Sequence, residues 1–420
     1  MSSETSAGIL TGLQVIEGSA FVAAPLGGMT LAQLGADVIR FDDIGGGLDY
    51  QRWPLAKGGQ SLFWAGMNKG KRSVSVNLHT DAGRELVTAL IEVAGNLITN
   101  FPARGWLSYD RLRERRPDLI MVALTGNRDG TSEVDYTVNP ATGFPLASGP
   151  RNLAEPANSL MPTWDAVMGG LTATGLLAAD RYRARTGEGQ LVGLALSDVA
   201  IAMVGNLGRV AEAQLGGQDQ TKDGNYLYGA FGHDFATGDG RRVMIVALTS
   251  RQWAALRKVT GLGDAFDQIG RATGLDLDSE SGRYEGRDMI AAILRPWFAA
   301  RDLATLRELF TGTGVSWGPY QSFTQLVEFD PRCSEANPMW SVTEHPGVGR
   351  YLMPGTPLDF SGVPRQPVRR APLLGEHTEE VLAELLGLTQ SEVGRLESDG
   401  TVALSSASVP STTAGQPARP

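Results

Sequence analysis

The sequence is poor in cysteine, histidine and positive charge, and each shortage excludes a class of protein. Its 420 residues include one cysteine, Cys333, which excludes an internal disulfide, a multi-cysteine zinc site and an iron–sulfur cluster. No two of the four histidines lie close in the sequence, so no histidine-based metal motif is present. Lysine and arginine number 37 against 46 acidic residues, and the net charge of −9 disfavours general nucleic-acid binding.

Long hydrophobic runs are also missing. No stretch of about 18 apolar residues occurs, so a membrane span is not expected. Residues 1–8 lack the basic and then apolar pattern of a secretory signal. The composition itself is globular, with 42% hydrophobic and 20% charged residues. These features predict a cytoplasmic protein, with neither membrane nor nucleic acid as a partner.

Short apolar runs alternate with stretches of helical spacing through the first half of the chain. This alternation is typical of an α/β protein with an open, mostly parallel sheet. The predicted strands are residues 13–16, 38–41, 73–76, 97–100, 119–124 and 190–196. The predicted helices of the same region are residues 25–34, 81–93, 109–116, 164–183 and 198–213.

The composition changes after the last of these helices. Residues 216–224 are polar and glycine-rich, which indicates a linker, and a strand at 242–247 then begins a smaller α/β domain. Residues 335–375 are rich in proline and glycine without a helical period, and a final helix is predicted at 378–386. Residues 401–420 are rich in serine, threonine, alanine and proline and are predicted to be disordered.

Two glycine motifs do not support the chemistry they suggest. Residues 314–318 match G-x-S-x-G, but a nucleophile elbow needs a helix directly after the serine, and Pro319 follows the motif. We therefore predict a turn there. The three glycines at 45–47 lack dinucleotide-binding spacing and do not open a helix, so a surface turn is predicted.

Two other features leave more than one interpretation open. Residues 68–73 (Asn-Lys-Gly-Lys-Arg-Ser) fit either a solvated charge run or a phosphate contact beside a strand. Asp165 lies at the start of a predicted helix. Its carboxylate could cap that helix, or it could be a nucleophile whose acyl oxyanion the nearby N–H groups stabilise. Local chemistry does not decide between the two.

Several segments resemble the class III CoA-transferases, the family of formyl-CoA transferase, carnitine CoA-transferase and α-methylacyl-CoA racemase. The resemblance extends over residues 8–395. The matching segments are GLQVIE at 12–17, LGADVI at 34–39, the basic cluster at 68–73, Asn-Phe at 100–101, Asp-Tyr at 135–136, TGEGQ at 186–190 and RAPLLGEHT at 370–378.

The resemblance implies roles for individual residues. Asp165 corresponds to the family's nucleophilic aspartate, because the T-G-x-G-Q turn follows it at the expected distance. CoA would be carried as the substrate thioester, with no permanently bound cofactor. The CoA contacts would be Phe21, Val22, His79, Asn100, Phe101, Arg104 and Tyr136. The sequence departs from the family at two positions, since Asp43 replaces an arginine and His79 replaces a lysine.

The resemblance also implies an architecture. A Rossmann-like large domain would comprise residues 1–215 and 328–400, and a small α/β domain residues 225–325. The chain would form a homodimer whose two subunits interlock like linked rings.

Within the family, the resemblance is greatest to the branch that moves CoA between the C1 and C4 carboxyls of mesaconyl-CoA. Residues 127–139 contain no histidine, which the racemase reaction requires there, and the tetraglycine loop of formyl-CoA transferase is absent. Two alternatives stay open: intermolecular CoA transfer to another carboxylate, and a non-catalytic CoA-binding protein. Residues 225–232 are the expected closure of the site, and Arg104 is expected, ahead of Arg52 and Arg128, to bind the free carboxylate.

Overall fold

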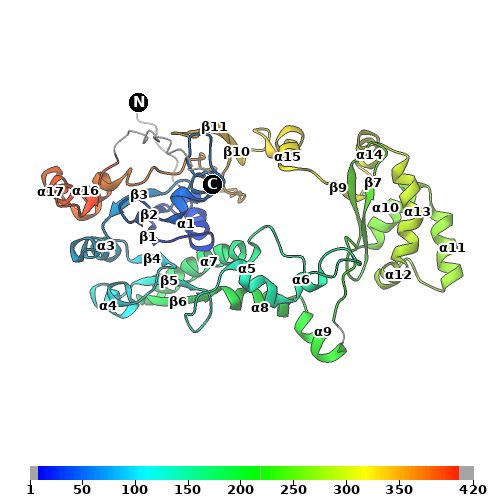
Figure 1. The fold of residues 1–420 in the computed structure, drawn as a ribbon, viewed down its shortest axis with the longest axis horizontal. Helices are drawn as coiled ribbons and strands as arrows, with labels where there is room; N and C mark the ends of the chain where they lie inside the picture. The colour runs from blue at the N-terminus through cyan, green and yellow to red at the C-terminus, as the bar shows by residue number, and fades with distance from the viewer. Residues whose placement is uncertain (1–7, 218, 406–420) are drawn as a thin grey trace, which may run out of the picture. The chain divides into compact units, whose positions relative to one another are not determined.

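The computed structural model describes residues 8–217 and 219–405, and the chain folds into two compact units. Unit 1 comprises Met1–Thr142, Ser159–Gly217 and Pro331–Pro420, and unit 2 comprises Gly143–Asn158 and Gln218–Asp330. In Figure 1, unit 1 is coloured mainly blue, cyan, orange and red, and unit 2 mainly green and yellow.

Residues 143–158, expected in the large domain, belong instead to unit 2. Polar contacts tie them to the start of that unit's main segment. Arg151 forms an ion pair with Asp223 at 2.5 Å, and the N–H of Gly224 donates to the carbonyl of Gly149 at 3.0 Å. Composition could not reveal this pairing, because the two segments lie far apart in the chain.

Unit 1 is built on a seven-stranded sheet in the order β12-β3-β2-β1-β4-β5-β6. The strands are β1 (Gln14–Gly18), β2 (Asp37–Asp42), β3 (Arg72–Val76), β4 (Asn96–Thr99), β5 (Ile120–Thr125), β6 (Gln190–Ala195) and β12 (Val402–Ala403). Strands β1 to β6 pair in parallel, which confirms the predicted open parallel sheet. Their order is that of the Rossmann fold, in which ligands bind at the carboxyl ends of the strands where the order reverses. Here that position lies between β1 and β4.

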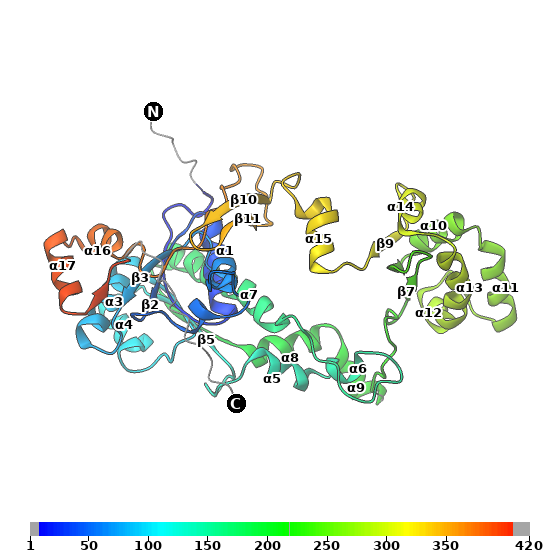
Figure 2. The same cartoon turned by 45° about the horizontal axis from the view of Figure 1, so that its top comes forward.

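Helices cover both faces of this sheet, as Figures 1 and 2 show. One face carries α1 (Ala23–Gln33) and α7 (Thr163–Thr186), and the other carries α3 (Asp81–Ala94), α4 (Tyr109–Arg115), α16 (Thr378–Leu386) and α17 (Gln390–Ser398). Fully buried apolar residues of the strands, such as Ile16 and Ile39, form the core beneath α3 and α16. The apolar residues that predicted these strands are therefore buried in the core.

Helices α1 and α7 pack closely because small residues line their contact. A Cβ atom added at Gly27 of α1 would lie 2.6 Å from Cγ2 of Thr172 on α7. A Cβ atom added at Gly169 of α7 would lie 2.7 Å from Cδ2 of Leu26 on α1. Any larger side chain at these glycines would push the helices apart. The packing thus fixes the start of α7 relative to β1 and α1.

The structure contains elements of unit 1 that the sequence analysis missed. Short elements complete the unit: α2 (Leu62–Met67), α5 (Asp135–Val138), α8 (Leu196–Asn206), α9 (Arg209–Gly216), and the hairpin of β10 (Trp340–His345) and β11 (Gly349–Pro354). The single helix predicted over 198–213 is divided into α8 and α9, because Gly208 adopts a left-handed φ of 79°. Helix α17 and the β10–β11 hairpin were not predicted.

The tail predicted to be disordered from residue 401 begins with ordered structure. Val402 and Ala403 of β12 pair antiparallel with Val76 and Ser75 of β3. Burial of Val402 in the core of unit 1 accounts for this order. Residues 406–420 of the predicted tail lie outside the described residues.

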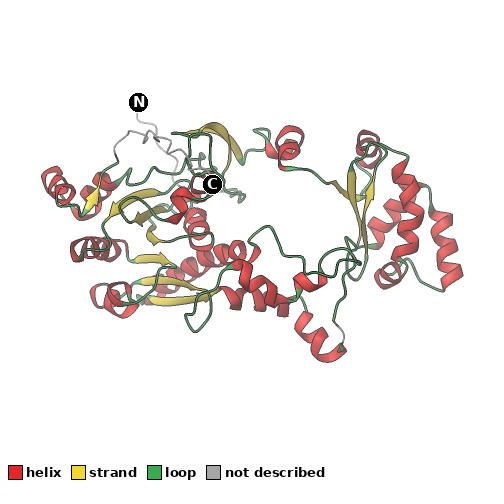
Figure 3. Cartoon of the chain, viewed as in Figure 1, coloured by secondary structure: helices red, strands yellow, loops and turns green. Residues whose placement is uncertain are grey.

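Unit 2 is mostly helical, with a small antiparallel sheet (Figure 3). Its strands are β7 (Phe231–Ala236), β8 (Arg242–Ala247) and β9 (Ser316–Pro319), in that order. Its helices are α6 (Phe144–Ala147), α10 (Ser250–Thr260), α11 (Gly263–Thr273), α12 (Glu280–Glu285), α13 (Arg287–Ala299), α14 (Leu303–Phe310) and α15 (Phe323–Phe329). An aromatic core that includes Trp253, Phe266 and Phe298 joins the sheet to the helices.

The two glycine motifs have different outcomes. The turn predicted over residues 314–318 is wrong for its last three residues, because Ser316 begins strand β9, which pairs with β8. The Oγ of Ser316 accepts a hydrogen bond from Gln252 at 2.7 Å, and no helix follows directly. Gly45 and Gly46 form a turn after β2 with φ of 91° and 83°. No helix within residues 8–217 or 219–405 is long and apolar enough to cross a membrane. The same residues contain no cluster of acidic, histidine or cysteine side chains that could hold a metal ion.

Candidate active site

Asp165 lies in the first turn of α7, but it does not cap the helix. The cap is Asp135, whose Oδ2 accepts the N–H groups of Trp164 at 2.7 Å and of Asp165 at 3.0 Å. The indole N–H of Trp164 donates to Oδ1 of Asn139 at 2.9 Å and fixes this turn from the side. The structural alternative for Asp165 is therefore wrong, because a residue 30 positions earlier performs the capping.

The carboxylate of Asp165 is half-buried and accepts no hydrogen bond from any described residue. The pKa of Asp165 is raised from 3.8 to about 6. Burial is the main cause, the charge of Asp135 also raises the pKa, and the charge of Arg52 lowers it. A carboxylate without hydrogen bonds keeps its lone pairs available for attack on an electrophile. At neutral pH most of this group is ionised, which is the form a nucleophile needs.

The helix N–H groups do not fill the role that the sequence analysis gave them. Two of them, those of Trp164 and Asp165, already donate to Asp135. The N–H of Ala166 donates to the carbonyl of Pro162 within the helix. These three groups are thus occupied, and an oxyanion formed on Asp165 would require other donors.

The loop after β1 is fixed from two sides at the point where the strand order reverses. The side chain of Asn100, which follows β4, accepts the N–H of Ala20 at 2.9 Å and donates to the carbonyl of Ala20 at 2.7 Å. The N–H of Phe21 donates to Oδ1 of Asp49 at 2.9 Å. Phe21 is the one described non-glycine residue with a left-handed backbone, at φ 69°. Such a conformation costs of order 1–3 kcal/mol and concentrates at functional sites.

A buried charge network supports this loop. The guanidinium of Arg40 pairs with Asp42 at 2.9 Å and Asp49 at 3.4 Å, and the amine of Lys71 pairs with Glu17 at 2.7 Å. Burial lowers the pKa of Lys71 to about 8. Both interpretations of the basic cluster are thus wrong for Lys71, which is neither solvated nor free for a phosphate, because Glu17 neutralises it inside the fold.

The structure gathers several of the predicted CoA contacts at the carboxyl ends of β1 and β4. Phe21 is 40% exposed, and Val22 next to it is buried at the start of α1. The side-chain amide of Asn100 is hydrogen-bonded to the backbone of Ala20. The Phe101 ring packs edge-on against the Phe41 ring, with centroids 6.0 Å apart. Of these residues, Phe21 thus presents the largest surface to a ligand.

The remaining predicted contacts lie at neighbouring strand ends. His79 follows β3, and its Nε2 lies 2.9 Å from Oδ2 of Asp43, which follows β2. The two departures from the family pattern therefore contact each other. Tyr136 directly follows the capping Asp135, is 45% exposed and donates to the carbonyl of Leu160 at 3.4 Å. Arg104 is exposed.

The structure favours a different arginine from the one that sequence reasoning ranked first. Arg52, not Arg104, is the arginine whose charge acts on Asp165. Its guanidinium lies over the rings of Phe21 and Phe63, 5.2 Å and 4.8 Å from their centroids. Arg128 pairs with Asp198 at 2.7 Å. The sequence signal that could have identified Arg52 is its position in the segment that follows β2.

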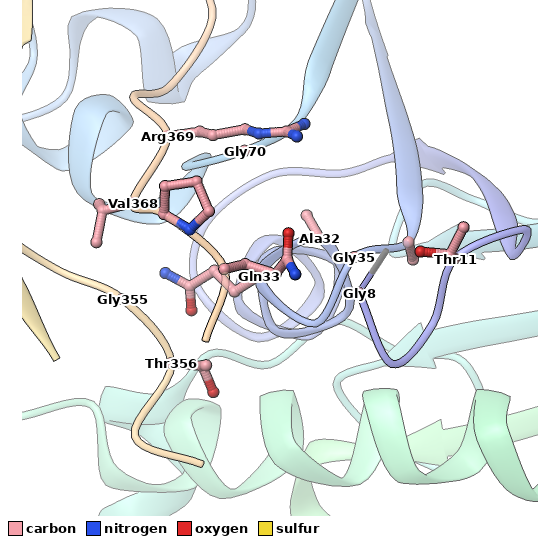
Figure 4. Close-up of a pocket in the computed structure, with 13 residues that line it drawn as sticks. Gly8, Thr11, Ala32, Gln33, Gly35, Gly70, Gly355, Thr356, Val368 and Arg369 are labelled. Atoms are coloured by element: carbon pink, nitrogen blue, oxygen red, sulfur yellow. The ribbon is translucent and has the colours of Figure 1, made fainter. Parts of the chain in front are cut away.

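A separate cavity of about 200 Å³ lies at the opposite edge of the sheet, beside the amino ends of β1, β2 and β3 (Figure 4). Figure 4 shows Gln33, Thr356 and Arg369 around it, with glycines between them. None of the predicted site residues lines this cavity. The candidate active site is therefore the edge that carries Asp165 and the loop after β1.

Comparison with known proteins identifies the family. The sequence profile of CoA-transferase family III matches residues 10–378. The chain belongs to this family. It is 59% identical to 2-methylfumaryl-CoA isomerase of Chloroflexus aurantiacus over 401 residues, which cover 94% of this chain and 98% of that protein.

Two further relatives of this family III chain are more distant. Succinyl-CoA:mesaconate CoA-transferase of Haloarcula marismortui is 29% identical over 93% of this chain and 100% of that protein. The crystal structure of a CaiB/BaiF family protein from Brucella suis has a TM-score of 0.74 at 26% identity, covering 90% of this chain and 100% of that one. The shared fold agrees with the α/β class predicted from sequence.

Asp165 should destabilise this family III protein at neutral pH. Because its pKa is about 6 in the folded state, against an ordinary value of 3.8, the folded protein binds the proton more tightly than the unfolded chain. The cost of the buried carboxylate is therefore absent below about pH 4 and grows as the pH rises through about 6.

Asp165→Asn should accordingly raise the free energy of unfolding by about 1–2 kcal/mol at pH 7.5, after allowance for partial exposure. The gain should shrink strongly at about pH 4.5, because the carboxyl of the folded protein is protonated there. Urea denaturation at both pH values measures it. Asp110→Asn, at an exposed site on α4, is the control and should change stability by less than about 0.5 kcal/mol. A gain independent of pH would contradict the assigned pKa.

Proposed function

We propose that this chain moves CoA from the C1 to the C4 carboxyl of mesaconyl-CoA within one substrate molecule, converting 2-methylfumaryl-CoA to 3-methylfumaryl-CoA. The observation that carries this proposal is the 59% identity to an enzyme named 2-methylfumaryl-CoA isomerase over 94% of the chain. The ionised, half-buried Asp165 without hydrogen bonds supports a covalent relay at this residue.

The substrate's geometry explains why a relay is needed. Its two carboxyls lie trans across a double bond and cannot meet to form a cyclic anhydride. The Asp165 carboxylate attacks the thioester carbonyl, which forms a mixed anhydride and expels CoA thiolate. The thiolate then attacks the Asp165 acyl carbon, which gives an aspartyl-CoA thioester and releases the dicarboxylate. After the dicarboxylate turns, its other carboxylate attacks the aspartyl thioester, and the same steps run in reverse.

CoA is on this proposal a substrate and not a resident cofactor, and it binds at the carboxyl ends of β1, β3 and β4. Strand ends of a Rossmann-order sheet favour nucleotide ligands, which supports the assignment. The proposed contacts are Phe21, Val22, His79, Asn100, Phe101, Arg104 and Tyr136. At the His79 position a lysine of the family would carry a free positive charge, whereas His79 here lies 2.9 Å from the carboxylate of Asp43.

A homodimer of interlocked subunits with a cytoplasmic location is also proposed. Exposed apolar side chains support a second copy as the partner. Helix α15 buries none of its residues, and Phe323 and Val327 on it are 83% and 61% exposed. On α9, Leu215 is 89% exposed. Large exposed apolar side chains grouped on one helix, as on α15, are typical of a surface that a protein partner covers.

Intermolecular CoA transfer is the second candidate, because a relative is named succinyl-CoA:mesaconate CoA-transferase. Isotope-labelled free mesaconate, added during turnover, separates the two functions. We expect labelled CoA thioester at well below about one part in a hundred, since a bound acid has an effective molarity far above that of a diffusing one. Mass spectrometry of the thioesters measures the label. Incorporation at a rate near kcat would establish the intermolecular function instead.

A further inference from the structure

Arg52 is a positive charge held beside the candidate nucleophile without an acidic partner. It follows the short turn of residues 48–51 after β2 and is half-buried. Its backbone is fixed on both sides, because its N–H donates to the carbonyl of Asp49 at 3.3 Å and its carbonyl accepts the Ser61 hydroxyl at 2.6 Å. The segment that presents this side chain is therefore ordered by contacts of its own.

The guanidinium lies against aromatic rings rather than carboxylates. It lies 5.2 Å from the ring centroid of Phe21 and 4.8 Å from that of Phe63. Rings orient a guanidinium by its face and leave its N–H edge free for a planar anion. Within residues 8–217 and 219–405 no carboxylate forms an ion pair with Arg52. By contrast, the nearby Arg40 is saturated by Asp42 and Asp49.

Arg52 is placed near Asp165 by the packing of α1 on α7. Its guanidinium lies over Phe21, two residues before α1, and Leu26 and Gly27 of α1 lie against Gly169 and Thr172 in the first half of α7. The charge of Arg52 accordingly acts on the Asp165 carboxylate, to which it does not hydrogen-bond. An acyl group attached to Asp165 would begin within the field of Arg52. The buried carboxylate at the far end of a short diacid needs a cationic partner, since leaving it unpaired costs several kcal/mol. Arg128 is unsuited to this task, because its side chain is 85% exposed and paired with Asp198.

We propose that Arg52 binds the carboxylate that is not bonded to CoA and so restricts the site to acyl-CoA thioesters that carry a second, nearby carboxylate. This inference rests on the proposed function, because it takes Asp165 as the point of attachment. After the dicarboxylate turns, its other end meets the same guanidinium. One cation then serves both halves of an isomerisation whose two ends differ only in the position of a methyl group.

Binding measurements in an Asp165→Asn background test the inference without turnover. The two ligands are 2-methylfumaryl-CoA and tiglyl-CoA, which has a methyl group in place of the free carboxylate. We expect Asp165→Asn to bind the first about thirtyfold or more tightly than the second. Adding Arg52→Met should erase that preference while leaving the Kd for tiglyl-CoA within about threefold, because the variant replaces none of the proposed CoA contacts and methionine can still pack on the Phe21 ring. Isothermal titration calorimetry measures both constants.

Two further variants keep the result decisive. Arg128→Met is the matched control and should preserve the preference. Arg52→Lys, which keeps the charge but loses the planar fork, should retain part of it, and it carries the test if Arg52→Met does not fold. A preference that survives Arg52→Met, or an equal loss for both ligands, would overturn the inference. Failure of the proposed function is visible separately, as a wild-type protein that is not acylated by 2-methylfumaryl-CoA.

Discussion

Replacing Asp165 by asparagine should abolish turnover of 2-methylfumaryl-CoA while leaving the protein folded. An amide cannot form the anhydride or the aspartyl thioester, so the whole relay is lost and not merely one of its steps. We expect residual kcat below about a hundredth of the wild-type value, a loss of more than about 3 kcal/mol in transition-state stabilisation. Wild-type activity should also fall as the pH drops below about 6, where Asp165 is protonated.

Trapping with hydroxylamine tests the covalent step directly. With thioester present, wild-type protein should yield a hydroxamate at Asp165, and Asp165→Asn should yield none. Ser316→Ala and Cys333→Ser are the controls, and both should keep activity. The Ser316 hydroxyl accepts a hydrogen bond from Gln252 inside a strand, and Cys333 is 5% exposed. Absence of any acyl adduct in the wild type would favour a non-catalytic CoA-binding protein.

The sequence predicted the sheet of unit 1 because each long strand carries a short group of β-branched or other apolar residues between helical segments, such as Val-Ile in β1 and β2. The missed elements lack that signal. Strands β10 and β11 form a hairpin that buries few of its side chains, and β12 has two residues. Helix α17 consists mostly of polar residues, and Val393 is the one residue of this helix that is buried. Their order comes from contacts with distant segments.

The candidate site shows the same division between local and long-range information. Asp165 could be found from its place before a helix and from family resemblance. Its unliganded state could not, because that depends on Asp135 taking the helix N–H groups. Likewise the local sequence predicts a surface charge at Lys71, whereas in the structure its amine is buried and paired with Glu17, 54 positions earlier. Pairings of this kind are set by the topology and leave no mark on the local sequence.

The buried pair of Glu17 and Lys71 also makes Gly28 of α1 intolerant of any side chain. A Cβ atom at Gly28 would lie 1.7 Å from Oε2 of Glu17. Glu17 cannot retreat cheaply, since its Oε1 is 2.7 Å from Lys71 and its removal would leave a buried amine unpaired. Nor can α1 shift outward, because Gly27 on the same helix abuts Thr172 of α7.

Gly28→Ala should therefore lower the free energy of unfolding by about 3–5 kcal/mol, the cost of breaking a buried ion pair. Gly170→Ala on α7 is the matched control. A Cβ there meets no atom within 4 Å, so the better helix former should be neutral or stabilising by up to about 1 kcal/mol. Urea denaturation compares both with the wild type. If Gly28→Ala stays within about 1 kcal/mol of the wild type, the Glu17 carboxylate can leave the network cheaply. In that case the buried pair of Glu17 and Lys71 would not hold α1 in place. The position of the Phe21 ring, on which Arg52 lies, would then depend on the hydrogen bonds with Asn100 and Asp49.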